Sequence, residues 1–489
     1  MKGDFTRDTF HPIKHFSRVL SQQGRVTVDA DANEQSAILL HMLRQLARDL
    51  IGPYAAPRDE GGFTIVAAGS GGFTIEAGRY YVDGILVEND ADCPYGAQPD
   101  WPVPADDPLA AWIKAPVASK AFWLYLDVWE RLITSVEDSS IREKALGGPD
   151  TAARAKVVWQ VKGLPIDPAS FTRNDRAYGL TAACAAPLGN LTPVSAATLA
   201  ARVDPGEVSD DPCVLSPHAR YRGAENQLYR VEIHIGGAAG AATFKWARDN
   251  GSRLAAWTGN GNGANELSVG NSRGFEAGNW VELSDDVTDL QGLPGTLVRL
   301  AKVEPGTLTL DAASIPNGAN VTWTPQLLNP KIRRWDQVQT GTTLLANGAV
   351  AVKEGTASVP LWLNLEDGVQ IAFSPGGAYR TGDYWMIPAR VATGDIEWPR
   401  IALGTGTGAA FVPPHGIVHH YAPLGFVAFA RNFIFRGCRC EFESASPCFQ
   451  GGSLAVGTRL LRSPEVSAAE RPARARTQPA RTRTRAANR

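Results

Sequence analysis

The fold class is decided by residues 73–88, which read FTIEAGRYYVDGILVE. Three short runs, Phe73 to Glu76, Arg79 to Val82 and Ile85 to Glu88, are rich in the β-branched and aromatic residues that favour strands. The last two runs are separated by Asp83-Gly84, a pair typical of a two-residue type I′ hairpin. This stretch predicts antiparallel strands joined by tight turns.

Similar strand and turn signals continue along the chain. In Gln227 to Ile235, apolar residues at odd positions form one face of a predicted strand, and Arg230 and Glu232 lie on the other face. Residues 280–310 predict a small barrel or sandwich that includes a hairpin turn at Pro305-Gly306. Further strands are predicted at Phe122 to Val128, Val157 to Val161, Ala242 to Ala247 and within Val350 to Ile387.

Composition agrees with a turn-rich β protein. Glycine (49) and proline (33) supply about a sixth of the 489 residues, against a usual share of about 12%. The net charge of −2 hides a division, because the stretch 471–489 holds seven arginines and no acidic residue. The first 470 residues keep 41 basic and 50 acidic residues, a net charge of −9, which argues against a general nucleic-acid binder.

The arm and helix at the start of the chain have clear local signals. Arg25 to Asp29 alternates like a strand, and Asp31 with Glu34 predicts a capping box at a helix start. Gly52-Pro53 predicts the helix end. The apolar stripe packs either against the chain's own β domain or against a copy or partner; the predicted assembly residues are Val26, Val28, Leu39, Met42, Leu43, Leu46 and Leu50.

We predict a mainly β fold of several small sandwich or barrel modules, with an extended arm, one amphipathic helix and a disordered tail. No apolar run is long enough for a transmembrane helix, and no secretory signal is recognisable, so synthesis in the cytoplasm is expected. The predicted segments are 1–58 (arm and helix for docking), 59–164 (β domain), 165–220 (Ala/Pro-rich insertion or linker), 221–330 (barrel or sandwich), 331–435 (β domain) and 436–489 (Cys-bearing segment and Arg-rich tail).

Several motifs resemble a large uncharacterised bacterial family whose genes lie beside contractile, phage-tail-like injection systems. The likeness extends over about residues 1–425. It is carried by Met1-Lys2-Gly3-Asp4-Phe5, Gln22-Gln23-Gly24-Arg25-Val26, Asp29 to Gln35, Asp127 to Arg131, Ala145 to Thr151, Glu225 to His234, Phe244-Lys245-Trp246, Arg334 to Gln337, Gly382 to Trp385 and Ile396 to Pro399.

The resemblance implies a structural or adaptor protein of a tail-like particle, baseplate-proximal or fibre-like, that assembles with other tail proteins and with copies of itself. Such a particle is assembled in the cytoplasm and then released. Some relatives append a right-handed β-helix, whereas this chain ends in its basic tail. The family supplies no catalytic residues or cofactor, so we predict none. Because the tail is a flexible cation, we predict that it tethers the protein to an anionic partner, lipid or polymer.

The alternative is a surface protein that binds or cleaves glycans. Cleavage needs two carboxylates about 5 to 10 Å apart, and glycans stack on aromatic rings. Thirteen tryptophans are present, most of them expected in the core. The carboxylates near aromatic residues are Asp127, Glu130, Glu232, Glu366, Asp367, Asp383, Asp395 and Glu397.

Histidines and cysteines offer weaker candidates. His415, His419 and His420 could bind a metal or serve as ordinary loop and strand residues, since Pro413-Pro414 and Gly416 argue against a shared helix face. The six cysteines are too scattered for a disulfide framework. Cys438, Cys440 and Cys448 leave open a zinc knuckle, a disulfide formed after export, or buried free thiols.

Overall fold

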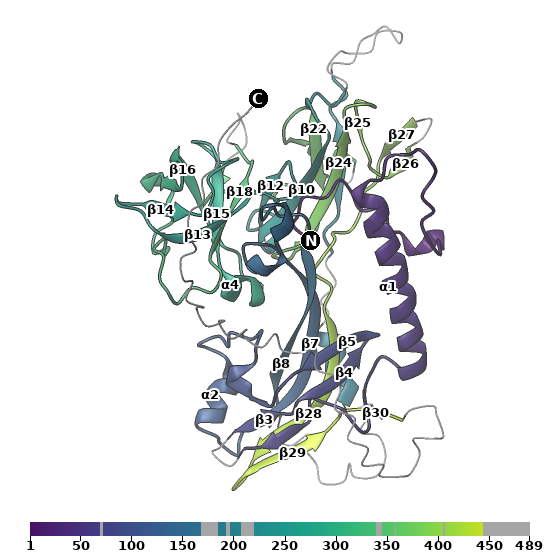
Figure 1. Ribbon diagram of the computed structural model, residues 1–489, viewed down its shortest axis with the longest axis vertical. Helices are drawn as coiled ribbons and strands as arrows, with labels where there is room; N and C mark the ends of the chain where they lie inside the picture. Colours follow the sequence, from purple (N-terminus) through teal and green to yellow (C-terminus); the bar gives the residue numbers. More distant parts are fainter. Residues whose placement is uncertain are drawn as a thin grey trace, which may run out of the picture. The chain divides into compact units, whose positions relative to one another are not determined.

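The computed structural model describes residues 1–68, 72–167, 184–191, 196–206, 220–338, 345–356, 358–403 and 406–443. Within these ranges the protein is mainly β, as predicted, with three α-helices (Figure 1): α1 (Asp29–Ile51), α2 (Pro108–Lys114) and α4 (Asp286–Leu290). Single 3-10 turns are η1 (Pro12–Lys14), η2 (Tyr95–Ala97), η3 (Ser139–Ile141), η4 (Lys144–Leu146), η6 (Ala186–Asn190) and η7 (Ala312–Ser314). The tail predicted to be disordered lies beyond residue 443, outside the described residues.

The first group of sheets surrounds one apolar core that includes Phe63, Tyr80, Trp112 and Trp159. Its longest sheet has the order β29 (Phe433–Gly437), β28 (His420–Phe429), β7 (Ala121–Ile133), β8 (Arg154–Ile166). A second sheet is β30 (Glu441–Phe442), β1 (Tyr54–Pro57), β4 (Gly78–Val82), β5 (Ile85–Asn89), and a third is β2 (Ile65–Ala67), β3 (Phe73–Ile75), β6 (Cys93–Pro94).

The hairpin predicted at Asp83-Gly84 is confirmed. It joins β4 to β5, and both residues have positive φ (48° and 79°), as a type I′ turn requires. Gly84 has a second role, because a Cβ there would lie 2.1 Å from the carbonyl oxygen of Arg44 in α1. The helix therefore packs directly on the backbone of this turn.

A second core lies between a six-stranded and a three-stranded sheet, and it buries Tyr229, Trp246, Phe373 and Trp385. The six strands are β19 (Leu345–Ala346), β20 (Ala349–Ala351), β12 (Thr243–Ala247), β10 (Gln227–Ile235), β24 (Tyr384–Arg390) and β25 (Asp395–Ile396). The three are β21 (Leu363–Asn364), β22 (Val369–Phe373) and β9 (Leu199–Val203). Two small pairs are β11 (Gly237–Ala238) with β23 (Ala378–Tyr379), and β26 (Arg400–Leu403) with β27 (Gly406–Ala409).

The barrel expected around residues 280–310 is a closed six-stranded barrel with its own apolar core. Gly306, at φ 76°, lies in the predicted turn between two of its strands. The order around the barrel is β13 (Leu254–Asn260), β14 (Glu266–Val269), β17 (Thr307–Leu310), β16 (Thr296–Glu304), β15 (Trp280–Ser284), β18 (Lys331–Trp335).

Strand pairing crosses the segments expected from composition. β9 lies in the stretch 165–220, whose composition predicts an insertion or linker. It nevertheless pairs along its length with β22. β28 pairs with β7 nearly three hundred residues earlier and so returns the chain to the first core. A strand can form antiparallel hydrogen bonds with a strand from any part of the chain, so composition along the sequence does not predict these pairings.

Two local predictions for the arm are wrong. Arg25 to Val28 forms no strand, and helix α1 begins at Asp29, with Val28 rather than Asp31 at the N-cap position. Glu34 of the expected box accepts a hydrogen bond from Thr9 instead, and Asp29, the first residue of the helix, accepts two from Thr6. The predicted end of the helix at Gly52 is confirmed.

Candidate functional site

A cavity of about 460 Å³ is the first candidate site. Its walls come from α1, α4, β5, β7, β10, β15, β18, β24 and β28, together with residues 1–2, 134, 137 and 416–418. The volume falls in the range of small-ligand pockets. The lining combines aromatic and apolar side chains, such as Trp129 and Leu132, with charged ones, so the state of those charges decides what the cavity can do.

A buried ionic network reaches the cavity through Lys2, Arg230 and Glu282, and Glu232 of β10 is its centre. The Glu232 carboxylate contacts Lys2 Nζ at 2.8 Å, Arg230 Nε at 2.6 Å and Lys245 Nζ at 3.3 Å. Lys245 also pairs with Glu282 of β15. Apart from Lys2, which lines the cavity, these residues are at most 4% exposed. We call Lys2, Arg230, Glu232, Lys245 and Glu282 the ionic network.

Pairing with cations holds the carboxylate of Glu232 in its ionised form, whereas burial lowers the pKa of Lys2 and Glu232 opposes that shift. Burial alone would raise the pKa of Glu232, but Lys2, Arg230 and Lys245 hold that pKa well below its usual range. His234, the next residue on the same face of β10, is buried, and its Nδ1 has no hydrogen-bond partner within the described part of the chain. Burial, followed by the charge of Lys245, lowers the pKa of His234 to about 4, so its ring is neutral at pH 7.

Aromatic rings complete the network. Trp335 Nε1 donates a hydrogen bond of 2.9 Å to Glu282 Oε2, and Lys245 Nζ lies 4.5 Å from the centre of the Trp335 ring. The guanidinium carbon of Arg230 lies 3.5 Å from the centre of the Tyr384 ring. These cation–π contacts add to the packing of the two cationic side chains against the aromatic wall.

The first three residues of the chain are bound into this region. Asn250 Nδ2 donates hydrogen bonds to the carbonyl oxygens of Met1 (3.0 Å) and Gly3 (2.9 Å). The amino group of Met1 donates to the Tyr384 hydroxyl at 2.7 Å. A Cβ on Gly3 would lie 2.8 Å from the Phe5 ring and 3.2 Å from Leu132, which explains a glycine at this position.

The motifs that carried the family resemblance meet here. Five of them, far apart in the sequence, contribute directly to the network or its aromatic wall: Lys2 from the opening motif, Arg230 and Glu232 from 225–234, Lys245 from 244–246, Trp335 from 334–337 and Tyr384 from 382–385. Much of this sequence signature therefore has a structural role.

The eight candidate carboxylates do not converge on one site. Glu130 alone among them lines the cavity, where it pairs with Arg44 at 2.8 Å. The others are spread over three sheets and their turns, most of them with a cationic partner: Asp127 with Lys162 and His419, Glu232 in the network, Glu366 with Arg248, Asp395 with Arg400, Glu397 with Arg7 and Arg390, Asp367 in a turn at φ 48°, and Asp383 buried.

One of the candidate carboxylates, Glu366, has a pKa raised toward neutrality. Burial raises its pKa to about 7; Arg248, 2.7 Å away, opposes the rise, and Asp336 and Asp367 add to it. A carboxyl group with such a pKa can donate or accept a proton near neutrality. It does not line the 460 Å³ cavity, and its contact is an ion pair.

The three candidate metal-binding histidines point to three different partners. His419 Nδ1 lies 2.7 Å from Asp127, and His420 Nδ1 lies 2.9 Å from Asp83. His415 packs against the ring of Tyr384, and burial lowers its pKa. Among the described residues, these histidines do not belong to any group with metal-ligand spacing.

One group does have such spacing: Glu137, Asp286 and Asp289. The ammonium group of Lys331 contacts all three carboxylates. Lys331 Nζ lies 2.7, 3.1 and 2.7 Å from these three carboxylates. Arg131 of β7 pairs with Glu137 and Asp286 as well. The cluster ties the barrel to the first group of sheets. Sequence reasoning missed it, because its members are separated by up to 200 residues.

The second candidate site is an exposed apolar surface on the arm and helix. We call it the arm–helix surface. All its members lie within residues 13–50, and nine of them are more than half exposed. Soluble proteins seldom leave so many large apolar side chains in water without a partner. The members are Ile13, Phe16, Leu20, Val26, Val28, Leu39, Leu40, Met42, Leu43, Leu46 and Leu50, which include every predicted assembly residue.

Comparison with known proteins now gives a family. A family model described as a family of unknown function, DUF6519, matches residues 1–183 and 168–489. The chain belongs to this family. No curated protein and no solved structure matches it. The matched stretches of this DUF6519 chain contain both the ionic network and the arm–helix surface.

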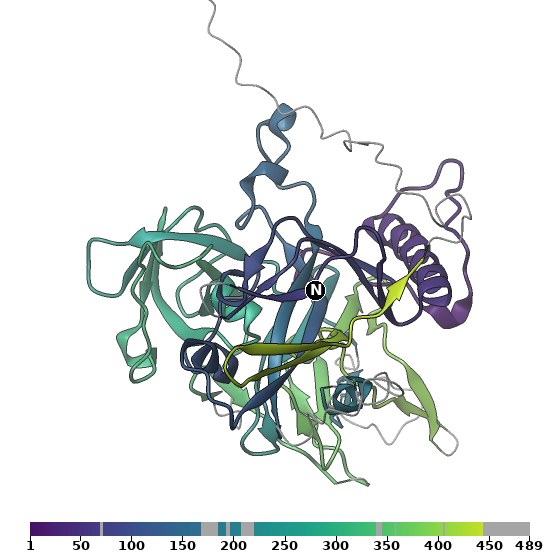
Figure 2. The same ribbon diagram turned by 90° about the horizontal axis from the view of Figure 1, so that it is seen from below.

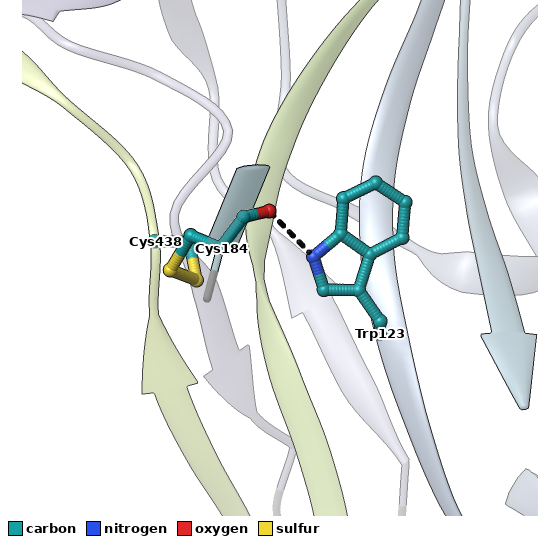
Figure 3. The surroundings of a disulfide bond; sticks show 3 residues. All are labelled: Trp123, Cys184 and Cys438. Atoms are coloured by element: carbon teal, nitrogen blue, oxygen red, sulfur yellow. Dashed lines mark hydrogen bonds between the residues drawn. A yellow bond between two sulfur atoms is a disulfide. The ribbon is translucent and has the colours of Figure 1, made fainter. Parts of the chain in front are cut away.

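A disulfide, Cys184–Cys438, is a further feature of the DUF6519 chain (Figure 3). It joins the stretch before η6 to the end of β29 across 254 residues, and the carbonyl oxygen of Cys184 accepts a hydrogen bond from Trp123 Nε1. Cys440 is a free thiol, and Cys448 lies outside the described residues. Of the three alternatives for Cys438, the structure shows a disulfide. Its partner, Cys184, lies within the stretch 165–220 that was predicted to be an insertion or linker.

Proposed function

We propose that this DUF6519 protein is a non-enzymatic assembly component of a contractile, phage-tail-like injection particle, docked through the arm–helix surface. The observation that carries the proposal is the apolar exposure of residues 13–50. Burying a single leucine stabilises an interface by about 1.5–3 kcal/mol, so six half-exposed side chains on α1 alone are enough for a stable contact.

The state of the cavity supports a structural role over glycan cleavage. Its four lining carboxylates are all ion-paired: Glu130 with Arg44, Glu137 with Arg131 and Lys331, Glu282 with Lys245, and Asp289 with Lys331. A general acid must be free to approach the substrate and donate a proton to it, whereas each of these four carboxylates contacts a cationic side chain at 3.2 Å or less. Within the described residues, no helix is both long and apolar enough to cross a membrane.

The proposal is tested in cells that make the protein. Sheathed particles are isolated by sedimentation, and the protein is followed by immunoblot in the particle fraction. The double variant Leu43→Asp/Leu46→Asp should reduce the amount of protein in the particle fraction at least tenfold, because it would bury two charges in an apolar contact.

The matched control is Leu146→Asp, an equally exposed leucine in η4 outside the arm–helix surface. This control should sediment with particles like the unaltered chain. Unchanged sedimentation of the double variant, or absence of the unaltered protein from particles, contradicts the proposed function.

A further inference from the structure

One wall of the 460 Å³ cavity is cationic. Arg230 of β10, Arg333 of β18 and Lys2 all line it. Arg333 lies on the outer face of the barrel, because its neighbour Ile332 is part of the barrel core and successive residues of a strand alternate between faces. Figures 1 and 2 both mark the start of the chain near the centre of the described sheets, and Lys2 reaches the cavity from there. We call Lys2, Arg230 and Arg333 the cationic wall.

Arg333 is the member of the cationic wall that has no carboxylate of its own. Lys2 and Arg230 share Glu232. Each of the four carboxylates that line the cavity contacts a cation other than Arg333. Glu282 stands opposite Arg333 on β15, yet within the described part of the chain no carboxylate forms an ion pair with Arg333. Because a guanidinium keeps its proton in proteins, Arg333 brings an uncompensated positive charge to the cavity.

The hydrogen bonds of Arg333 leave one edge of its guanidinium open. Nη1 donates to the carbonyl oxygen of Gly251. Nε and Nη2 have no hydrogen-bond partner among the described residues, and neither atom is fully buried. These two nitrogens form a flat edge that donates to both oxygens of one carboxylate at once. Arg230 contacts Glu232 and Asn250 through Nε and Nη1, and its Nη2 is unpartnered within the same residues. The cationic wall therefore offers free donors to an anion.

Other parts of the lining supply an apolar surface. Trp129 and Leu132 come from β7, and Ile417 and Val418 come from the loop before β28. Ile417 and Val418 are 50% and 66% exposed, so they lie where the cavity meets solvent. Small-ligand sites typically combine such apolar walls with a few placed polar groups. This lining fits a ligand that has one anionic group and an apolar body.

We propose that the cavity binds a small carboxylic acid with an apolar or aromatic body. Its carboxylate accepts hydrogen bonds from Nε and Nη2 of Arg333, and its body packs against Trp129 and Leu132. One unpaired guanidinium matches one negative charge, whereas a phosphate monoester brings about 1.5 to 2. The site shares no residue with the arm–helix surface, so this inference goes beyond assembly and does not depend on it.

The pKa values of two bases near the cationic wall agree with a shortage of negative charge. Burial lowers the pKa of Lys2; Glu232 opposes the shift and Lys245 adds to it. Burial, followed by the charge of Lys245, lowers the pKa of His234 to about 4. A carboxylate bound at the wall favours the protonated form of Lys2 and relieves Glu232, which otherwise pairs with three cations.

Isothermal titration calorimetry on the full chain tests the class of ligand, with phenylacetate as the probe. Phenylacetate should bind saturably at one site per chain. Acetate lacks the apolar body and 2-phenylethanol lacks the charge, so each should bind at least tenfold more weakly; phenyl phosphate should also bind more weakly than phenylacetate. Absence of saturable phenylacetate binding overturns the proposal, as does equal affinity for acetate or 2-phenylethanol. Tighter binding of phenyl phosphate overturns the assignment to a carboxylate.

Two variants test the position of the acid. Arg333→Gln should weaken phenylacetate binding at least tenfold, whereas Arg299→Gln, which removes the same charge from an exposed position of β16, should change it less than twofold. Ile417 is half exposed, so Ile417→Glu should fold and should weaken binding at least tenfold by placing a negative charge at the mouth of the cavity. Far-UV circular dichroism checks that the variants fold. Unchanged affinity in either Arg333→Gln or Ile417→Glu overturns the proposed site.

Discussion

The two ends of the N-terminal arm have opposite environments. Residues 1–3 place Lys2 beside buried Glu232, whereas residues 13–50 leave leucines and valines in water. The usual distribution of charged and apolar side chains is reversed. Buried charge is tolerated because each group is paired, and exposed apolar area is stable only when another surface covers it. We infer that the first part of the arm serves stability and the second serves assembly.

The largest expected effect on stability is at Glu232. Glu232→Gln leaves Lys2, Arg230 and Lys245 around a neutral amide in a buried site, so the free energy of unfolding should fall by about 3–5 kcal/mol. Urea unfolding followed by tryptophan fluorescence measures it. Glu304→Gln, which removes an exposed pair with Lys302, should cost less than about 1 kcal/mol. Equal losses in the two variants would erase the contrast between buried and exposed charge.

A pH effect of intermediate size is expected from His234. Its folded pKa of about 4 lies below the usual 6.5, so between these values the unfolded chain binds a proton that the folded chain does not. The contribution of His234 to stability is therefore lost as the pH falls, by about 2 kcal/mol from pH 7 to pH 5. Urea titrations at several pH values measure how the free energy of unfolding depends on pH. This dependence should be weaker for His234→Gln; an unchanged dependence would assign the effect to other groups.

An effect confined to one element is expected where α1 packs on Gly84. Gly84→Ala places a methyl group against the Arg44 carbonyl and adds a side chain at positive φ, so it should cost about 1–3 kcal/mol and speed amide exchange in residues 29–51. Gly376→Ala is the matched control, since Gly376 has the same φ of 79° but nothing within 4 Å. If both variants exchange alike in α1, Gly84 does not hold the helix.

Local features were predictable because they depend on neighbours in sequence. The Asp83-Gly84 hairpin, the end of α1 at Gly52 and strand β10 follow from turn chemistry and alternation. The start of α1 was missed because contacts with the arm act there: Thr9 donates to Glu34, the expected partner of Asp31, and Thr6 donates to Asp29 at the true first residue of the helix. Tertiary contacts of this kind override a local capping signal.

The candidate sites also combine features that local spacing predicts with features that depend on tertiary contacts. The assembly residues on α1 could be named from helical spacing, but spacing left both an inward and an outward stripe open. Their exposure depends on Gly84 and Glu130, which engage the other face of the helix. Candidate carboxylates and histidines could be named by type only, since their ion pairs join residues up to several hundred positions apart.

The sequence by itself determined a β-rich chain with one amphipathic helix and a set of short motifs, because turns, alternation and helical periodicity act over a few residues. Tertiary structure alone decided that those motifs meet around Glu232, that Cys184 pairs with Cys438, and that the leucines of α1 face solvent. Burial and charge pairing depend on which distant strands pack together, and a linear pattern does not specify that packing.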